Sequence, residues 1–491
     1  MTSKIPITAS ELRKRSSPEN CWLAVDGAVW DLTEFAPEHP GGADIIYKYA
    51  GRDATAIYNS IHAPSLIQTE LGASKRIGDF DSSNVLPDSD ISEDPEPAVS
   101  PLPAKTAAGR RPLQTLISSH DFEQAASENL SEKAWAFFSS AATDCITEKA
   151  NAAYFGRMWL RPRILRNVRE VSTRTKMLGN DVSLPLFVSP TAMAKLAHPD
   201  GELAIAKGCS KYNIAQTIST NASFPMTDIA SSTDIPLFFQ LYVNKDRAAS
   251  EKLLKQAEQC GMRGIFVTVD QPTPGKREAD ERIKADAAAL RPTPNGAVAR
   301  NDTKGSGLGR TMSGYIDSTT SWQDIKWLRS VTRLPIVLKG VQTAADAILA
   351  VEHGIDGLLI GNHGGRSLDT STPAILVLLE LQLRCPDIFR HIEVYLDGGI
   401  RRGTDIFKAL CLGAKAVGMG RSFLYAANYG SEGVEQLIEI MKDEFETTMR
   451  MMGCTDLSQL HPGLLNTCEV DNMIPRTLDR GLGPMVPKSR L

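Results

Sequence analysis

The 491-residue sequence has no stretch of about 18 consecutive apolar residues, so no membrane span is expected. It also lacks a long basic run, and its formal net charge is -4, so the electrostatic footprint of a nucleic-acid-binding protein is missing. None of its eight cysteines is spaced as Cys-x-x-Cys, which argues against a zinc site and a disulfide framework. These absences predict a soluble intracellular protein with reduced thiols.

The two ends of the sequence bear on its compartment. The first residues, MTSKIPITASEL, contain neither the apolar core of a signal peptide nor a long Arg-rich presequence. The last three, Ser489-Arg490-Leu491, differ from the Ser-Lys-Leu peroxisomal signal by Arg for Lys. We therefore expect a peroxisomal or cytosolic location, with the mitochondrial intermembrane space as the alternative.

A change in composition divides the chain. Residues 81–112 are rich in Pro, Ser and acidic residues, a composition that cannot bury enough apolar surface to offset chain entropy. We predict a flexible linker there, between an N-terminal domain at 1–80 and a larger domain at 113–475. Residues 476–491 are predicted to form a C-terminal tail.

The larger domain alternates short apolar runs with segments of helical periodicity. Continuous apolar runs separated by helices are typical of a parallel sheet, and eight such units predict a closed barrel. The fold class is thus α/β, a (β/α)8 TIM barrel, preceded by a small α+β domain. The runs are LFVSPTA (186–192), AQTIS (215–219), PLFFQLY (236–242), GIFVTVD (264–270), PIVLKG (335–340), GLLIGN (357–362), EVYLDGG (393–399) and AVGMG (416–420).

Two histidines of the N-terminal domain, His39 and His62, lie in segments that favour haem binding. His39 precedes Pro40-Gly41-Gly42, a turn that fixes the direction of its imidazole. Two imidazoles on opposite sides of an iron leave no open position, so such a haem transfers electrons. The EHPGG block and the second histidine resemble the cytochrome b5 family over residues 5–80. This resemblance implies that His39 and His62 are the axial ligands of a haem b.

Polar residues end several apolar runs, where the chemistry of barrel enzymes collects. The sixth run is followed by His363, a base near neutral pH, and by Arg366, whose planar fork suits a carboxylate. Asp270 ends the fourth run within reach of His363, where it would fix the tautomer. Lys339, near the end of the fifth run, needs a negative partner such as a reduced flavin.

Glycines and arginines follow the seventh and eighth runs. The segments Asp397-Gly398-Gly399-Ile400-Arg401 and Gly420-Arg421 offer backbone N–H groups and positive charge to an anion. Because the loops after strands seven and eight commonly hold phosphate in such barrels, we expect a phosphate there.

Several stretches resemble the FMN-dependent 2-hydroxy acid dehydrogenase and oxidase family: SPTAM, FFQLYV, VTVDQPTPGKRE, PIVLKGV, NHGGRSLD, DGGIRRGTDIFKALCLGA and GMGRSFLY. With the haem domain, they make the whole chain resemble the flavocytochrome b2 family. The resemblance implies that His363 is the base with Asp270 as its partner, and that Tyr242, Arg366 and Arg277 hold the substrate. It implies that FMN contacts Ser189, Pro190, Thr191, Ala192, Ser219, Gln240, Thr268, Lys339, Asp397, Gly398, Gly399, Ile400, Arg401, Gly420 and Arg421.

The chain departs from the family pattern at the substrate. Phe137-Phe138 replaces a Tyr-Tyr pair, which removes a hydroxyl from the substrate site, and Ala141 replaces a glycine. Gly361 stands where the family usually has serine. Asn221 occupies a position that usually offers an apolar wall to the substrate side chain. We hypothesise that the substrate carries a polar or larger substituent that meets Asn221; a lactate enzyme in which these positions have drifted is the alternative.

The resemblance implies oxidation of an L-2-hydroxy acid, lactate or a related acid, to the 2-oxo acid. Electrons would pass from FMN to haem b and on to cytochrome c or a similar acceptor, in a homotetramer. An oxidase that reduces O2 to H2O2 is the alternative and would suit a peroxisomal address. A non-catalytic redox carrier or sensor is a further one, although it would require loss of the base or the arginine.

Overall fold

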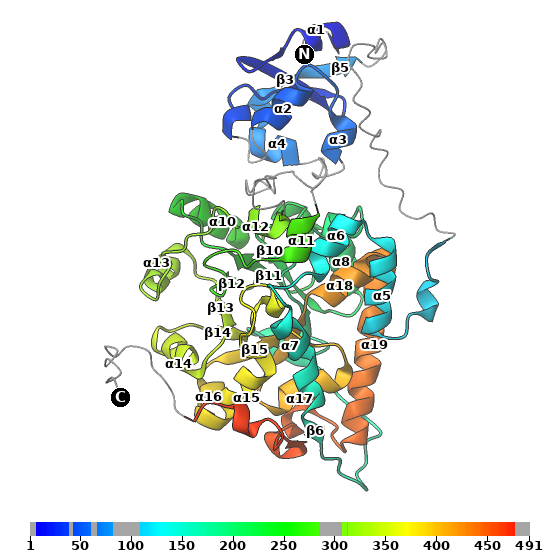
Figure 1. The fold of residues 1–491 in the computed structure, drawn as a ribbon, viewed down its shortest axis with the longest axis vertical. Coiled ribbons are helices and arrows are strands. Elements are labelled where there is room, and N and C mark those ends of the chain that lie inside the picture. The colour runs from blue at the N-terminus through cyan, green and yellow to red at the C-terminus, as the bar shows by residue number, and fades with distance from the viewer. Residues whose placement is uncertain are drawn as a thin grey trace.

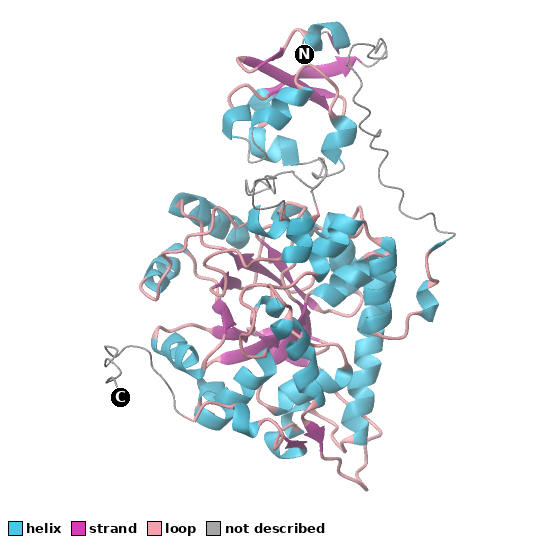
Figure 2. Ribbon diagram, viewed as in Figure 1, coloured by secondary structure: helices cyan, strands magenta, loops and turns pink. Residues whose placement is uncertain are grey.

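The computed structural model describes residues 6–38, 43–59, 66–81, 109–283, 307–311 and 313–476. They form a small body with a mixed sheet and a larger body built around a barrel (Figures 1 and 2). Most of the predicted linker and nearly all of the C-terminal tail lie outside these ranges, so the predicted domain limits stay predictions. Within the ranges, no helix has the length and apolar character needed to cross a bilayer.

The small body is a five-stranded sheet with short helices packed on it. The strand order is β1 (Ile7–Thr8), β5 (Arg76–Asp81), β4 (Ala28–Asp31), β3 (Asn20–Val25) and β2 (Ser16–Ser17). The helices are α1 (Ala9–Arg13), α2 (Ala43–Tyr49), α3 (Thr55–Asn59) and α4 (Leu66–Leu71). Asp26-Gly27 joins β3 to β4 with φ of 49° and 73°, the left-handed turn for which Asp-Gly is preferred in hairpins.

The predicted haem ligands His39 and His62 lie outside the described residues. The elements that flank them are described. Ile46 on α2 is 5% exposed and Ile57 on α3 packs against the same core, which also contains Trp30 of β4. The helices next to both histidines are therefore anchored in the apolar core of the small body.

The eight apolar runs all form strands, and these strands close into a parallel barrel, as the sequence predicts. The closed order is β10-β11-β12-β13-β14-β15-β16-β9. Their bounds are β9 (Leu186–Val188), β10 (Ala215–Ser219), β11 (Leu237–Leu241), β12 (Ile265–Thr268), β13 (Ile336–Val341), β14 (Gly357–Ile360), β15 (Glu393–Asp397) and β16 (Ala416–Met419). The helices between and after them are α8 (Gly201–Ser210), α9 (Met226–Ser231), α10 (Arg247–Gln259), α11 (Glu278–Arg282), α12 (Leu308–Thr311), α13 (Asp324–Val331), α14 (Ala344–Glu352), α15 (Ala374–Arg384), α16 (Ile388–His391), α17 (Gly403–Cys411), α18 (Arg421–Ala427) and α19 (Gly430–Met451).

Side chains of the strands alternate between the barrel interior and the surrounding helices. A hairpin of β7 (Thr175–Met177) and β8 (Asn180–Val182) packs on the interior layer and closes the amino-terminal end of the barrel, where Leu178 N donates to Glu393 Oε2 at the start of β15. The interior layer takes one residue from each strand: Phe187, Ala215, Phe238, Phe266, Val337, Leu359, Tyr395 and Ala416.

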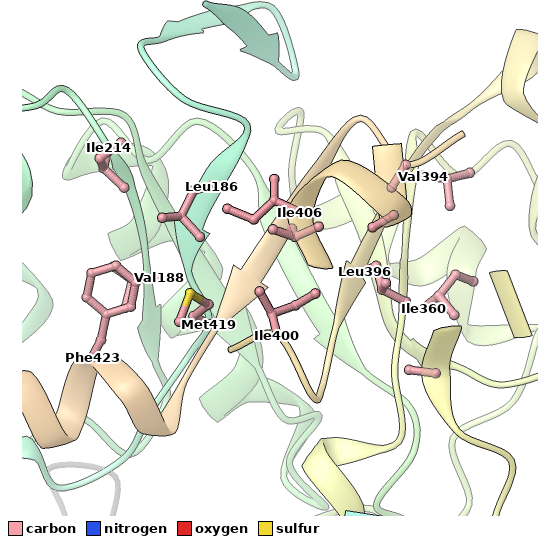
Figure 3. Close-up of a cluster of buried hydrophobic side chains, with 14 of the residues drawn as sticks. Leu186, Val188, Ile214, Ile360, Val394, Leu396, Ile400, Ile406, Met419 and Phe423 are labelled. Carbon is pink, nitrogen blue, oxygen red and sulfur yellow. The ribbon is translucent and has the colours of Figure 1, made fainter. Parts of the chain in front are cut away.

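The outward layer of the strands packs against helices, as Figure 3 shows. Leu186 of β9 and Leu396 of β15 are fully buried, and Met419 of β16 is 2% exposed. They belong to the same cluster as Ile406 of α17 and Phe423 of α18. Full burial of each such side chain contributes roughly 1.5–3 kcal/mol, which explains why the apolar runs specify the strands.

Three helices precede the barrel: α5 (Ser119–Asn129), α6 (Glu132–Ser139) and α7 (Ile146–Gly156). They contact segments at the carboxyl ends of the strands. α5 and α6 pack on α18, α6 also packs on α11, and α7 packs on the turn at His363–Gly365. These helices thus form part of the wall around the site.

Candidate active site

The carboxyl ends of the barrel strands surround a large cavity. Apart from Asp270, every barrel residue predicted for the substrate and FMN sites lines it. Those residues are Phe137, Ser189, Pro190, Thr191, Ala192, Ser219, Asn221, Gln240, Tyr242, Thr268, Arg277, Lys339, His363, Arg366, Asp397, Gly398, Gly399, Ile400, Arg401, Gly420 and Arg421. Asp270 contacts His363, so the structure brings the whole predicted set together.

His363 lies three residues after the end of β14, in a turn that aims its ring into the cavity. Its φ of 58° is left-handed, and the Asn362 side chain stabilises the turn by accepting from Gly365 N at 3.1 Å. His363 Nδ1 lies 3.0 Å from Oδ1 of Asp270, whose side chain is fully buried. Because a carboxylate only accepts, Nδ1 carries the proton and Nε2 is the atom able to receive one.

The electrostatics of this pair suit a general base. Burial holds the pKa of His363 at about 4, with Asp270 opposing the effect and Lys339 adding to it. Burial acts to raise the pKa of Asp270, but attraction to His363 and Lys339 outweighs it, so that pKa lies below its ordinary value. At neutral pH the pair is a neutral imidazole beside a carboxylate anion, which stabilises the imidazolium once a proton arrives.

A reciprocal amide pair supports the histidine turn. Asn151 Nδ2 donates to Asn362 Oδ1 at 2.8 Å, and Asn362 Nδ2 donates to Asn151 Oδ1 at 2.9 Å. Both side chains are 1% exposed. Because buried amides are costly when unpaired, this pair fixes the turn against α7. Asn151 was not predicted from the sequence, because nothing marks its contact with a residue 211 positions away.

Four arginines of the described residues line the cavity: Arg277, Arg366, Arg401 and Arg421. Arg366 Nη1 donates to the carbonyls of Phe138 at 2.8 Å and Ser140 at 2.9 Å, which orients the group. Burial, and then repulsion by Arg277 and Arg421, hold the pKa of Arg366 well below its usual value. Clustered cations in a buried site favour an anionic ligand such as a carboxylate or phosphate.

Lys339 of β13 places a charge in the cavity wall. It is 3% exposed and its Nζ lies 3.8 Å from Asp397 Oδ2, which also accepts from Ser189 Oγ at 3.1 Å. Burial acts to lower the pKa of Lys339, but Asp397 and Asp270 raise it above its ordinary value, so the ammonium stays charged. Asp397 Oδ1 is buried with no hydrogen-bond partner among the described residues. A cation beside an unpaired acceptor fits a ring that has N–H groups and takes up electrons, as flavin does.

Glycines after β15 and β16 let backbone N–H groups line the cavity. Gly398 and Gly399 have φ of 96° and 89°, which glycine adopts without steric cost, and a Cβ on Gly399 would lie 2.3 Å from Asn151 O. Arg421 also lines the cavity, where its charge suits a phosphate. Arg401 also lines the cavity, but its Nη2 donates to Glu123 and lies 3.0 Å from His120 Nδ1.

The departures from the family pattern form contacts of their own. Phe137 is 3% exposed, and its ring lies 5.3 Å from the Arg366 guanidinium, so a cation–π contact stands where a tyrosine hydroxyl is lost. Asn221 Oδ1 accepts from the Tyr315 hydroxyl at 3.2 Å. Asn221 therefore lines the cavity with a buried amide that is hydrogen-bonded to Tyr315, a partner that the sequence did not predict.

The closeness of Asp397 explains why position 361 is a glycine in this chain. A Cβ at this position would lie 2.2 Å from Asp397 Oδ1. A serine would displace the Asp397 carboxylate from its present place between Ser189 and Lys339. The glycine at position 361 therefore leaves room for the Asp397 carboxylate in its present place.

The model of the FMN-dependent dehydrogenase family matches residues 126–467. The chain belongs to this family. A second model, the cytochrome b5-like haem/steroid binding domain, matches residues 8–81. This FMN-dependent dehydrogenase thus carries a haem domain before its barrel, and its cofactors are FMN and haem b.

Curated relatives match nearly the whole chain. L-lactate dehydrogenase (cytochrome) of Wickerhamomyces anomalus is 40% identical over 474 residues, 95% of this chain and 81% of that protein. The protein of the same name from Saccharomyces cerevisiae is 41% identical over 481 residues, 94% of this chain and 80% of that protein. The solved flavin-binding domain of baker's yeast flavocytochrome b2 superposes with a TM-score of 0.67 at 40% identity, over 77% of this chain and 95% of that chain.

Proposed function

We propose that this FMN-dependent dehydrogenase oxidises an L-2-hydroxy acid, lactate or a related acid, and passes the electrons through haem b to cytochrome c or a similar acceptor. The observation that carries the proposal is the contact of 3.0 Å between His363 Nδ1 and the Asp270 carboxylate, in a cavity that is also lined by the guanidinium groups of Arg277 and Arg366. The name of the two curated relatives supports the substrate and the acceptor.

The side chains have separate tasks in this proposal. His363 Nε2 takes the proton of the substrate hydroxyl, and Asp270 stabilises the resulting imidazolium. Arg366 binds the substrate carboxylate, with Arg277 as a second positive group and Tyr242 beside them. FMN, when bound, supplies two-electron acceptor chemistry, and Lys339 adds a fixed positive charge that favours its anionic reduced form. His39 and His62 are the proposed haem ligands.

Asn221 in the cavity wall bears on the substrate side chain. A methyl group against its buried amide gains less than it would against an apolar wall, whereas a polar substituent can exchange hydrogen bonds with the amide. We therefore extend the proposal to a substrate with a polar or larger substituent. Replacing Asn221 by Leu is expected to shift the preference toward lactate, as measured by kcat/KM over a panel of acids. Lactate as the best substrate of the unaltered protein would remove this extension.

One experiment tests the main proposal. The purified full chain is examined by absorption spectroscopy and then given a panel of 2-hydroxy acids with cytochrome c or with O2. We expect flavin and Soret bands, and haem reduction that is faster than peroxide formation. A protein without a Soret band after haem supplementation, or one that forms peroxide faster than it reduces haem, would contradict the haem-coupled proposal. Full turnover by His363→Asn would contradict the assigned base.

We also propose that copies of the chain assemble, as a homotetramer, through an apolar surface near the end of α19. Ile164 and Leu165 are 83% and 101% exposed, and Met451 is 72% exposed. The segment that carries Ile164 and Leu165 lies close to the carboxyl end of α19. A Cβ on Gly453, two residues after that helix ends, would lie 2.6 Å from Arg163 O. Side chains this exposed favour a partner. Light scattering is expected to show that Leu165→Asp lowers the assembled mass, whereas Leu383→Asp, on α15, does not; an unchanged mass would contradict this surface.

A further inference from the structure

Gln271 directly follows Asp270 and is buried in the cavity wall at 4% exposure. Its amide joins two hydroxyls. The Tyr242 hydroxyl lies 3.3 Å from Gln271 Oε1, and Gln271 Nε2 lies 2.7 Å from Ser313 Oγ. Ser313 Oγ in turn lies 2.9 Å from the carbonyl oxygen of Gly309 on α12. A line of hydrogen bonds therefore runs from α12 to Tyr242.

The far end of this line sets its direction. A carbonyl oxygen only accepts, so Ser313 donates its single hydroxyl proton to Gly309. Ser313 Oγ is then the acceptor for Gln271, which places the NH2 group of the amide toward Ser313. The amide oxygen therefore faces Tyr242, and Tyr242 donates its only proton to Gln271.

This direction has a consequence for His363. The Tyr242 oxygen also lies 3.3 Å from His363 Nε2. With its proton engaged by Gln271, that oxygen presents lone pairs to Nε2. A neutral His363, whose proton is on Nδ1 toward Asp270, presents a lone pair as well, so the two atoms form no hydrogen bond. Once Nε2 is protonated, its N–H donates to Tyr242.

We propose that Gln271 is a positioning residue that keeps Tyr242 an acceptor and thereby makes His363 a stronger base. The proposal rests on the proposed function, in which His363 takes the substrate proton. Charged groups from other elements also act on His363: Asp270 favours the imidazolium, whereas Lys339 and Arg277 oppose it. Gln271 carries no charge and acts on the basicity of His363 through the Tyr242 oxygen that faces Nε2, a position that none of these charged groups controls.

The decisive variant is Gln271→Leu, which removes both amide bonds at similar volume. Tyr242 is then able to donate to neutral His363, which weakens the base. We expect the acidic limb of the kcat/KM profile of the holoenzyme to move to lower pH by roughly one unit, the shift that one hydrogen bond supports. The oxidation rate at neutral pH is expected to fall several-fold. A purely structural role would lower the rate without moving the limb.

A second readout does not depend on turnover. NMR of holoenzyme labelled with nitrogen-15 histidine follows the protonation of His363, with His363→Asn identifying its signal. The midpoint is expected to fall in Gln271→Leu in parallel with the kinetic limb. If no acid is turned over, the proposed function fails, while this midpoint still tests the role of Gln271.

Two more variants complete the test. Ser313→Ala removes the acceptor that orients the amide, so we expect a smaller shift in the same direction. In a Tyr242→Phe background, Gln271→Leu is expected to produce no further shift, because the oxygen that relays the effect is gone. The proposal is overturned if the midpoint stays or rises in folded, flavin-loaded Gln271→Leu, or if the shift persists without the Tyr242 hydroxyl.

Discussion

Replacing Asp270 by Asn tests the central electrostatic claim about the base. The contact between His363 Nδ1 and Asp270 Oδ1 is 3.0 Å, which puts the charge centres of an imidazolium and the carboxylate about 4 Å apart. At an effective dielectric of about 20 their attraction is about 4 kcal/mol. If proton transfer is about half complete in the transition state, about 2 kcal/mol is lost, a roughly 30-fold slower step; full charge development sets a limit of about 1000-fold.

The assay is the rate of flavin reduction by substrate in a stopped-flow mixing experiment, which isolates the chemical step from later electron transfer. Asp346→Asn, which removes a carboxylate from the first turn of the outer helix α14, is the matched control and is expected to leave the rate unchanged. The reasoning is refuted if Asp270→Asn, with normal flavin content, reduces its flavin within about threefold of the unaltered protein.

Three further predictions follow from the site. Arg366→Lys keeps the charge but loses the planar guanidinium, which Nη1 orients by donating to two backbone carbonyls, so kcat/KM is expected to fall about 10- to 100-fold; an unchanged kcat/KM would count against a carboxylate clamp. Because the base works only when neutral and burial holds the pKa of His363 at about 4, activity is expected to fall as the pH drops through about 4 and to stay level above it; a limb near the ordinary histidine value would contradict this environment. Gly361→Ser pushes on Asp397, so FMN binding is expected to weaken roughly tenfold in a titration of the flavin-free protein, and unchanged affinity would show that Asp397 moves without cost.

The barrel could be predicted from the sequence because its strands are buried on both faces. Runs such as PIVLKG and GLLIGN read as continuous apolar segments, and the structure places them as the neighbouring strands β13 and β14. The β7–β8 hairpin that closes the barrel had no comparable signal, since its segments are only three residues each. Short strands carry too little periodicity to separate them from turns.

The site was predictable to the extent that its residues follow strand ends. His363, Asp270 and Lys339 are found that way, because parallel strands bring their carboxyl ends to one rim. Partners supplied by other segments were not found. Asn151 comes from a helix before the barrel, and Tyr315 lies between α12 and α13, so their contacts depend on the closed fold. Family motifs could not reveal them, because these residues lie outside the matching stretches.

The reciprocal amide pair of Asn151 and Asn362 also links the catalytic turn to a segment that precedes the barrel. Asn151 precedes the first barrel strand and Asn362 follows the sixth, 211 positions later, so the turn that aims the base gains its support only after most of the chain has been made. A fragment that begins at the first barrel strand would lack Asn151 and so would lose the amide partner of Asn362. Maturation of the catalytic turn is therefore tied to the helices that come before the barrel.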